Sequence, residues 1–335
     1  MSGIVEIAKR AGVSPATVSR ALRGMHHVNE RTRTKIIEAA QHLDYPIRPD
    51  LLPPSATPRT NTIGVMAPFL SRWYFSQAIA GAEQALREAG MDLLLFNFAQ
   101  VDARQRVFQQ KKLVGKVDGL IVISLPPTER EFEQILGLGI PVSLLGISSD
   151  RCSSVSIDDI KGGETATQHL IDSGHRDIAI MVGQNAFNFN FEVADKRYLG
   201  FQNVLQENGI ELDPNFKIVA DFDSHTSELA MTEFLNRKKL PTAIFCESDE
   251  MAFGAIKAIR KKGLRVPEDI SIIGYDDHEF ATTIGLTTIS QPVQFLGQLA
   301  ASQIMAQIEK PDRNSAQMNV PTSLVIRESV RDLTK

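Results

Sequence analysis

Apolar residues recur every three or four positions in the first segment of the chain, which predicts short helices that each bury one face. The first stripe consists of Ile4, Ile7, Ala8 and Ala11. A second and a third stripe follow, made of Val18, Ala21 and Leu22 and of Ile36, Ile37, Ala40 and Leu43. The pattern predicts three helices that close one small core.

The turn between the first two helices carries strong local signals. Gly12 suits a tight turn, Ser14 suits a helix N-cap, and Pro15 then occupies the first helical position, where its missing N–H costs nothing. The second helix keeps a polar, basic face with Arg20 on it. This arrangement predicts a helix-turn-helix, whose second helix enters a DNA major groove. An ordinary surface hairpin of two helices is the alternative.

A helix-turn-helix would contact DNA through the start and the polar face of its second helix. Arg20 is expected at base edges or phosphates, whereas Pro15 and Ala16 can only offer apolar contact to a thymine methyl group. The full set of expected DNA-binding residues is Ser14, Pro15, Ala16, Thr17, Ser19, Arg20 and Arg23.

From residue 62 onwards, near-continuous apolar strands alternate with amphipathic helices, which is typical of parallel sheets covered on both faces. The expected strands are 63–67, 92–96, 117–123, 140–145, 178–182, 243–246 and 271–275. The expected helices are 75–88, 104–114, 129–138, 164–173, 195–208, 226–237, 251–262 and, after a chain crossover, 295–308. The pattern therefore predicts an α/β fold for most of the chain.

Charge is unevenly divided along the 335 residues. Residues 1–60 hold nine Lys and Arg against five Asp and Glu, a net charge of +4 within a total of −4, which leaves −8 for the rest. A basic headpiece on an acidic body suits a DNA-binding module joined to a ligand-binding module.

Other classes of site find little support in the sequence. There is no Gly-x-Ser-x-Gly elbow, no phosphate-binding glycine loop, no metal spacing and no nucleophile–base pair, so we expect no catalytic residue, metal or cofactor. Cys152 and Cys246 are expected to be ordinary buried thiols. No apolar run approaches the ~18 residues of a membrane span, and no apolar leader precedes the first helix, which favours a cytoplasmic protein.

The run from Ile4 to Leu22 resembles the opening of the lactose-repressor/galactose-repressor (LacI/GalR) family of bacterial transcription regulators, and later segments extend the likeness over almost the whole chain. The resemblance implies an N-terminal all-α helix-turn-helix headpiece before a two-lobed, periplasmic-binding-protein-like core of doubly wound parallel sheets. It implies a homodimeric repressor of double-stranded operator DNA, controlled by a small-molecule effector, a sugar or sugar derivative bound between the lobes. A solute-binding protein or an enzyme of carbohydrate metabolism is the alternative. The headpiece and the lack of a signal peptide argue against the first, and the lack of catalytic motifs argues against the second.

The expected domains follow from this likeness. The headpiece comprises residues 1–46, a proline-rich linker 47–60 and the core 61–335, with lobe 1 at about 61–160 plus 291–320 and lobe 2 at about 161–290 plus 321–330. In the family the linker usually carries a short hinge helix. Here Pro53, Pro54 and Pro58 would interrupt a helix, so we expect an extended linker instead.

The expected effector site lies at the carboxyl ends of the strands, where open parallel sheets bind ligands. Phe69, Trp73 and Phe75 follow the first strand and can offer flat faces to a sugar ring, or can simply pack against the next helix. The Asn/Phe alternation at 184–191 is either a cleft wall or a lid.

The remaining effector residues come from the resemblance. Arg197 matches the arginine that binds ligand hydroxyls, Ser248 and Asp249 match the segment that places polar groups in the cleft, and Asp276 matches the ligand carboxylate. The alternatives are a surface ion pair of Arg197 with Asp195 or Glu192 and a helix N-cap for Asp249.

Overall fold

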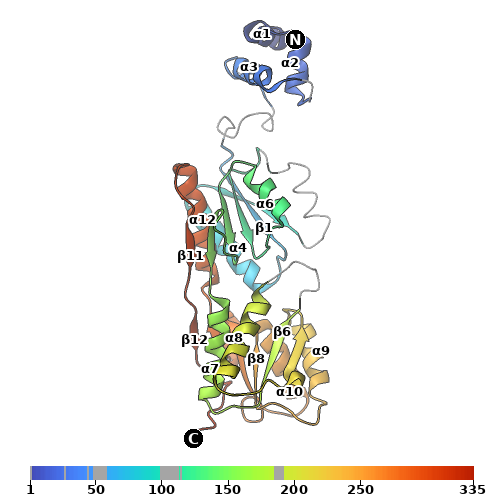
Figure 1. The fold of residues 1–335 in the computed structure, drawn as a ribbon, viewed down its shortest axis with the longest axis vertical. Helices are drawn as coiled ribbons and strands as arrows, with labels where there is room; N and C mark the ends of the chain where they lie inside the picture. The colour runs from blue at the N-terminus through green and yellow to red at the C-terminus, as the bar shows by residue number, and fades with distance from the viewer. Residues whose placement is uncertain are drawn as a thin grey trace.

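The computed structural model describes residues 2–25, 28–43, 45–47, 59–98, 113, 115–184 and 192–335. In these ranges the chain forms three N-terminal helices and then two α/β lobes, which Figure 1 shows one above the other. The linker residues 48–58, nearly all of the predicted helix 104–114 and the Asn/Phe segment 185–191 lie outside the described residues.

The headpiece consists of α1 (Ser2–Ala11), α2 (Pro15–Leu22) and α3 (Glu30–Gln41). Gly12 turns the chain between α1 and α2 with a φ of +68°, and the Ser14 hydroxyl caps α2 by accepting a hydrogen bond from the Thr17 N–H at 3.1 Å. Eight buried side chains form a core of their own: Ile7, Ala8, Val18, Ala21, Val28, Ile36, Ala39 and Ala40. All of them except Val28, in the α2–α3 connection, and Ala39 belong to the predicted stripes.

Lobe 1 is built on a parallel sheet in the order β11-β5-β4-β3-β1-β2. Its strands are β1 (Thr62–Ala67), β2 (Asp92–Asn97), β3 (Gly119–Ile123), β4 (Val142–Leu145), β5 (Ser153–Ser156) and β11 (Gln317–Asn319). Helices α4 (Trp73–Glu88) and α12 (Val293–Glu309) pack on one face, and α6 (Glu129–Leu136) packs on the other.

Lobe 2 repeats this plan in the order β12-β10-β9-β8-β6-β7, with only β12 antiparallel to its neighbour. Its strands are β6 (Ile178–Gly183), β7 (Lys217–Ala220), β8 (Ala243–Cys246), β9 (Ser271–Asp276), β10 (Thr287–Ser290) and β12 (Ser323–Val325). Its helices are α7 (Asp159–Asp172), α8 (Val193–Glu207), the 3₁₀ turn η3 (Pro214–Phe216), α9 (Ser224–Phe234), α10 (Asp249–Lys261) and α11 (Glu279–Ile284).

The central strands β1, β3, β4, β6, β8 and β9 are buried along nearly their whole length because helices cover both faces of each sheet. In β6, Ile178 and Ile180 pack with the side that carries α7 and α8, whereas Ala179 and Met181 pack with the side that carries α9 and α10. The predicted α/β class and the doubly wound parallel sheets are confirmed. Cys152 and Cys246 are buried free thiols, as predicted.

In the described part of the chain, the backbone passes between the lobes after β5, after β10 and between β11 and β12. The first residues of the core are fastened to lobe 1, because the N–H groups of Thr60 and Asn61 donate to the Asp118 carboxylate at 2.9 and 2.7 Å. Arg59 also donates to the Ile308 carbonyl of α12 at 2.9 Å. Among the described residues, no helix has both the length and the apolar character needed to cross a membrane.

Candidate functional site

The first candidate surface is the outer face of α2. Ser14, Pro15, Ala16, Arg20 and Arg23 are exposed, and Thr17 and Ser19 are half-buried at its edge. The buried side of the same helix carries Val18 and Ala21. The sequence-predicted DNA-binding residues therefore share one accessible face, opposite the core that holds the helix in place.

The second candidate surface is a cavity where the carboxyl ends of the two sheets meet. Lobe 1 contributes Phe75, Ser124 and Gly146, which follow or lie near β1, β3 and β4. Lobe 2 contributes Arg197, Ser248 and Asp276. Further lining residues are Arg72, Tyr74, Pro126, Ile147, Ile157, Asp159, Glu192, Val193, Lys196, Phe222, Glu250, Gln291 and Leu296.

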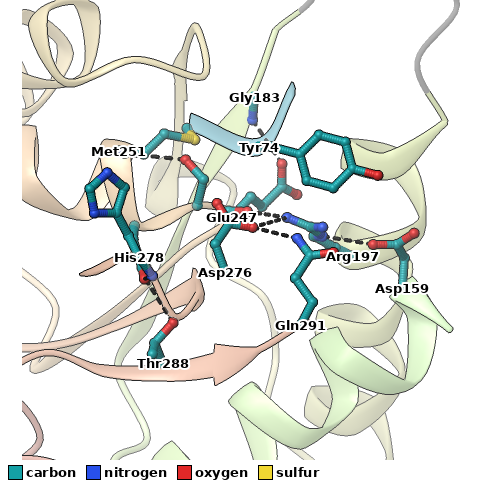
Figure 2. A network of polar contacts seen from close by, with 12 residues as sticks. Tyr74, Asp159, Gly183, Arg197, Glu247, Met251, Asp276, His278, Thr288 and Gln291 are labelled. Carbon is teal, nitrogen blue, oxygen red and sulfur yellow. Dashed lines mark hydrogen bonds and ion pairs between the residues drawn. The ribbon is translucent and has the colours of Figure 1, made fainter. Parts of the chain in front are cut away.

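Arg197 is the central cation of this cavity and is almost entirely buried. Figure 2 shows its guanidinium beside Asp159 and Asp276; Nε donates to the Asp159 carboxylate at 2.9 Å, and Nη1 lies 4.0 Å from Asp276 Oδ1. The guanidinium carbon lies 3.5 Å from the centre of the Tyr275 ring, and Nη1 donates to the Glu247 carbonyl. Burial lowers the pKa of Arg197, but Asp159, Tyr275 and Asp276 outweigh it and raise the pKa, so the cation is permanent.

The alternative of a surface ion pair between Arg197 and Asp195 or Glu192 is therefore wrong. The ion-pair partner is Asp159, because α7 begins at Asp159, five residues before the predicted start, and aims this side chain at α8. Glu192 instead pairs with Lys196 at 2.8 Å. The contacts of Arg197 with described side chains and carbonyls use Nε and Nη1, so the two N–H groups of Nη2 can donate to a ligand.

Asp276 ends β9 in an unusual backbone conformation, with a φ of +120°. Its Oδ1 accepts a hydrogen bond from the Gln291 side chain at 2.6 Å. Burial raises the pKa of Asp276 to about 7, although Arg197 and Gln291 oppose the shift. A strained, buried carboxyl group at a strand end is typical of a functional position.

Ser248 lines the cavity as predicted, whereas Asp249 takes neither of the roles predicted for it. The N-cap of α10 is Ser248, whose hydroxyl accepts from the Met251 N–H at 3.2 Å, and Ser248 also lines the cavity. Asp249 is neither the N-cap nor part of the lining. Its carboxylate is buried, accepting from the Thr288 hydroxyl at 2.7 Å and from the His278 N–H at 2.8 Å.

The aromatic residues after β1 separate into two groups. Phe75 lines the cavity, while Phe69 lies outside the lining and packs edge-on against Phe75 at 5.7 Å between ring centres, with Arg72 above it at 4.0 Å. Trp73 also lies outside the lining and contacts lobe 2. The structure therefore brings together four of the seven predicted effector residues, namely Phe75, Arg197, Ser248 and Asp276.

Sequence reasoning missed several polar lining residues. Tyr74 lies between Trp73 and Phe75 in the sequence. Burial raises the pKa of its hydroxyl to about 12, so this hydroxyl is neutral. Gln291 stands just after β10, a short strand that the sequence pattern does not predict. The adjacent acids Asp158 and Asp159 are expected from the sequence to cap a helix or support the cleft; Asp158 caps α7, and Asp159 lines the cavity. Glu250 follows Ser248 and Asp249 in the predicted segment. Within the described residues, no cluster of three His, Cys, Asp or Glu side chains can hold a metal ion.

Comparison with protein families gives two matches. Residues 3–47 match the model of bacterial regulatory proteins of the lacI family, and residues 167–330 match a periplasmic binding protein-like domain. The first match covers the three headpiece helices, and the second covers most of lobe 2 together with α12 and the two C-terminal strands.

Individual proteins match over the full length. The chain is 32% identical to the ribose operon repressor of Haemophilus influenzae, over 99% of this chain and 100% of that protein. It superimposes on a complex of the transcriptional regulator CelR with cellobiose with a TM-score of 0.72 and 28% identity, over 97% of this chain and 99% of the other. A lac repressor dimer bound to operator and the anti-inducer ONPF gives a TM-score of 0.70 and 28% identity over 97% and 98%.

Proposed function

This chain belongs to the lacI family of bacterial regulatory proteins, and from that premise we propose that it is a dimeric, cytoplasmic repressor controlled by a sugar or sugar derivative. The observation that carries the proposal is the interlobe cavity, in which carboxyl, hydroxyl, amide and guanidinium groups converge beside aromatic rings. The domains act as headpiece (1–46), linker (47–60) and two-lobed core (61–335).

The cavity suits a neutral polyol better than a charged ligand. Its buried cation Arg197 is matched by Asp159, and Lys196 is matched by Glu192, so neither presents an uncompensated charge. Phe75 and Phe222 supply apolar faces for a sugar ring, and the Asp276 carboxyl group accepts hydrogen bonds from sugar hydroxyl groups. The cellobiose complex of a similar regulator supports this choice of ligand.

The effector acts by favouring one arrangement of the lobes. Since the lining comes from both lobes, a ligand that contacts both binds one relative orientation more tightly, and it shifts the equilibrium by that difference in affinity. The two headpieces of a dimer then change their spacing on an operator with two half-sites. Binding and control of DNA, rather than catalysis, account for the residues assembled here.

A reciprocal pair of variants tests the proposal. An operator is selected from randomised duplexes, its affinity for the full chain is measured by fluorescence anisotropy at fixed salt, and ligands are sought by thermal shift with ribose, cellobiose and other sugars. Arg20→Ala should weaken operator binding by about 1–3 kcal/mol and leave sugar binding unchanged. Asp276→Ala should weaken sugar binding by about 1.5–3 kcal/mol and leave sugar-free operator affinity unchanged.

Each variant is the control for the other, since both must retain their helix content and cooperative unfolding. Operator affinity unchanged in Arg20→Ala would remove that arginine from the DNA interface. Sugar affinity unchanged in Asp276→Ala would remove the cavity from the effector site. Absence of any stabilising sugar would exclude the proposed ligand class.

A further inference from the structure

Trp73 joins the two lobes although it lies outside the cavity. It is the first residue of α4 in lobe 1, and its indole ring stacks on His278 of lobe 2, with 5.0 Å between ring centres and 30° between planes. The indole N–H donates to the carboxylate of Glu279, the first residue of α11. One side chain of lobe 1 therefore makes both an aromatic and a polar contact with lobe 2.

The backbone of Trp73 adds a third contact between the lobes. Its N–H lies close enough to the carboxyl group of Glu250 in α10 to oppose the rise in the pKa of Glu250 that burial causes. The N-cap residue of α4, Arg72, makes no side-chain capping bond, and the Glu250 carboxyl group of the other lobe lies near this helix end. Negative charge at a helix N-terminus is favourable because the helix dipole is positive there.

The partner surface on lobe 2 is fixed without help from lobe 1. The His278 N–H donates to Asp249 at 2.8 Å, and its ring nitrogen Nδ1 accepts from the Phe280 N–H at 3.0 Å. The rings of Phe253 and Phe280 pack on the imidazole with centre distances of 5.2 and 5.3 Å. Separation of the lobes removes Trp73 from this surface and leaves the surface intact.

We propose that Trp73 is a clasp between the lobes: its contacts with His278, Glu279 and Glu250 favour the closed arrangement and raise effector affinity without touching the effector. The inference rests on the proposed function, because it concerns the same cavity. Neighbours of the clasp on both sides, Arg72, Tyr74 and Glu250, line that cavity, so closure of the clasp and closure of the cavity are one movement. Apparent affinity falls in proportion to the fraction of closed molecules.

The clasp carries its own reporter, since Trp73 is the only tryptophan of the chain. In the full-length protein without ligand, Glu279→Ala removes the indole acceptor from an exposed position. We expect tryptophan emission to move to longer wavelength and acrylamide quenching to rise by about twofold as closed molecules open. Glu207→Ala, an exposed glutamate at the end of α8, is the matched control and should behave like the wild type.

A second experiment measures the binding of ribose and cellobiose by calorimetric titration. Trp73→Phe keeps a stacking ring but loses the indole N–H and should bind the sugar a few-fold more weakly, whereas Trp73→Ala should bind it about tenfold more weakly. Identical emission and quenching of the wild type and Glu279→Ala would overturn the clasp even if neither sugar binds. Wild-type sugar affinity in Trp73→Ala would overturn it as well, whereas failure of both sugars to bind the wild type counts against the proposed ligand class alone.

Discussion

Asp276 and Arg197 show how single residues acquire their roles from what surrounds them. Both occupy positions that the sequence pattern predicts: Asp276 lies at the end of a strand, and Arg197 lies near the start of a helix. Their chemistry depends on neighbours supplied by other segments, since Gln291 orients the Asp276 carboxyl group and Asp159 orients the Arg197 guanidinium. Residue type and position alone therefore locate the site without describing it.

The raised pKa of Asp276 predicts a pH dependence of stability. The folded protein holds this proton up to a pH of about 7, whereas the unfolded chain releases it near the ordinary aspartate pKa of 3.8. Between these values the native state binds more protons than the unfolded state, so the free energy of unfolding falls as pH rises and levels off above about 7.

Chemical denaturation across this pH range tests the expectation. The decline should be shallower in Asp276→Asn, which keeps the shape of the side chain but cannot ionise. Loss of Asp276 also removes one cause of the raised pKa of its neighbour Asp249, where burial is the largest cause, and this change acts in the same direction. Equal slopes in the two proteins would show that Asp276 does not titrate in this range.

Pairs of helices determine how closely the site residues approach. Gly200 of α8 faces the Ile160 carbonyl of α7, and Gly163 of α7 faces the Arg197 carbonyl of α8; a Cβ atom at either glycine would overlap the opposing oxygen. The two glycines let α7 and α8 pack backbone to backbone, which brings Asp159 of one helix to Arg197 of the other.

A single methyl group should therefore disturb both packing and ligand binding. Gly200→Ala is expected to lower the free energy of unfolding by about 1–3 kcal/mol, as overpacking does. It should also weaken sugar binding, because α8 must move away from Asp159. Thermal unfolding and calorimetry measure the two effects, with Leu199→Ala, at an exposed neighbour on the same helix, as the control. Unchanged stability would mean that the helices separate at no cost.

The elements that the sequence revealed are the long and apolar ones. Strands such as Ile178–Gly183 can be predicted because both faces are buried and the sequence is apolar throughout. The helices that follow them have regularly spaced apolar residues. The missed strands β5 and β10 read Ser-Ser-Val-Ser and Thr-Thr-Ile-Ser. Their polar side chains are buried and bond to distant partners. For example, Thr287 Oγ1 accepts a hydrogen bond from the backbone N–H of Arg327, near the carboxyl terminus, at 2.9 Å.

This explains the incomplete prediction of the site. Gln291 comes directly after β10, and because the sequence pattern does not predict this strand, it gives no reason to include Gln291 in the site. The position of Trp73 after β1 correctly predicts that it lies near the cavity, but not that it contacts His278. No local sequence pattern shows that a residue at the start of α4 reaches a histidine more than two hundred positions away.

At the scale of the whole molecule, the headpiece and the two lobes have separate hydrophobic cores. The eight buried headpiece residues share no member with the clusters of either lobe. We therefore expect residues 59–335 to fold alone and to bind the sugar with the affinity of the full chain, while binding no operator. Calorimetry and anisotropy on this fragment check both statements, and a fragment that fails to bind sugar would show that the headpiece contributes to the core.

The hydrogen bonds from Thr60 and Asn61 to Asp118 determine which lobe the start of the core moves with. They attach the first residues of the core, Thr60 and Asn61, to lobe 1. Because donors and acceptor all belong to lobe 1, rotation of lobe 2 leaves these hydrogen bonds in place. We therefore expect an effector to act on DNA binding by changing the distance between the two copies of lobe 1 in a dimer.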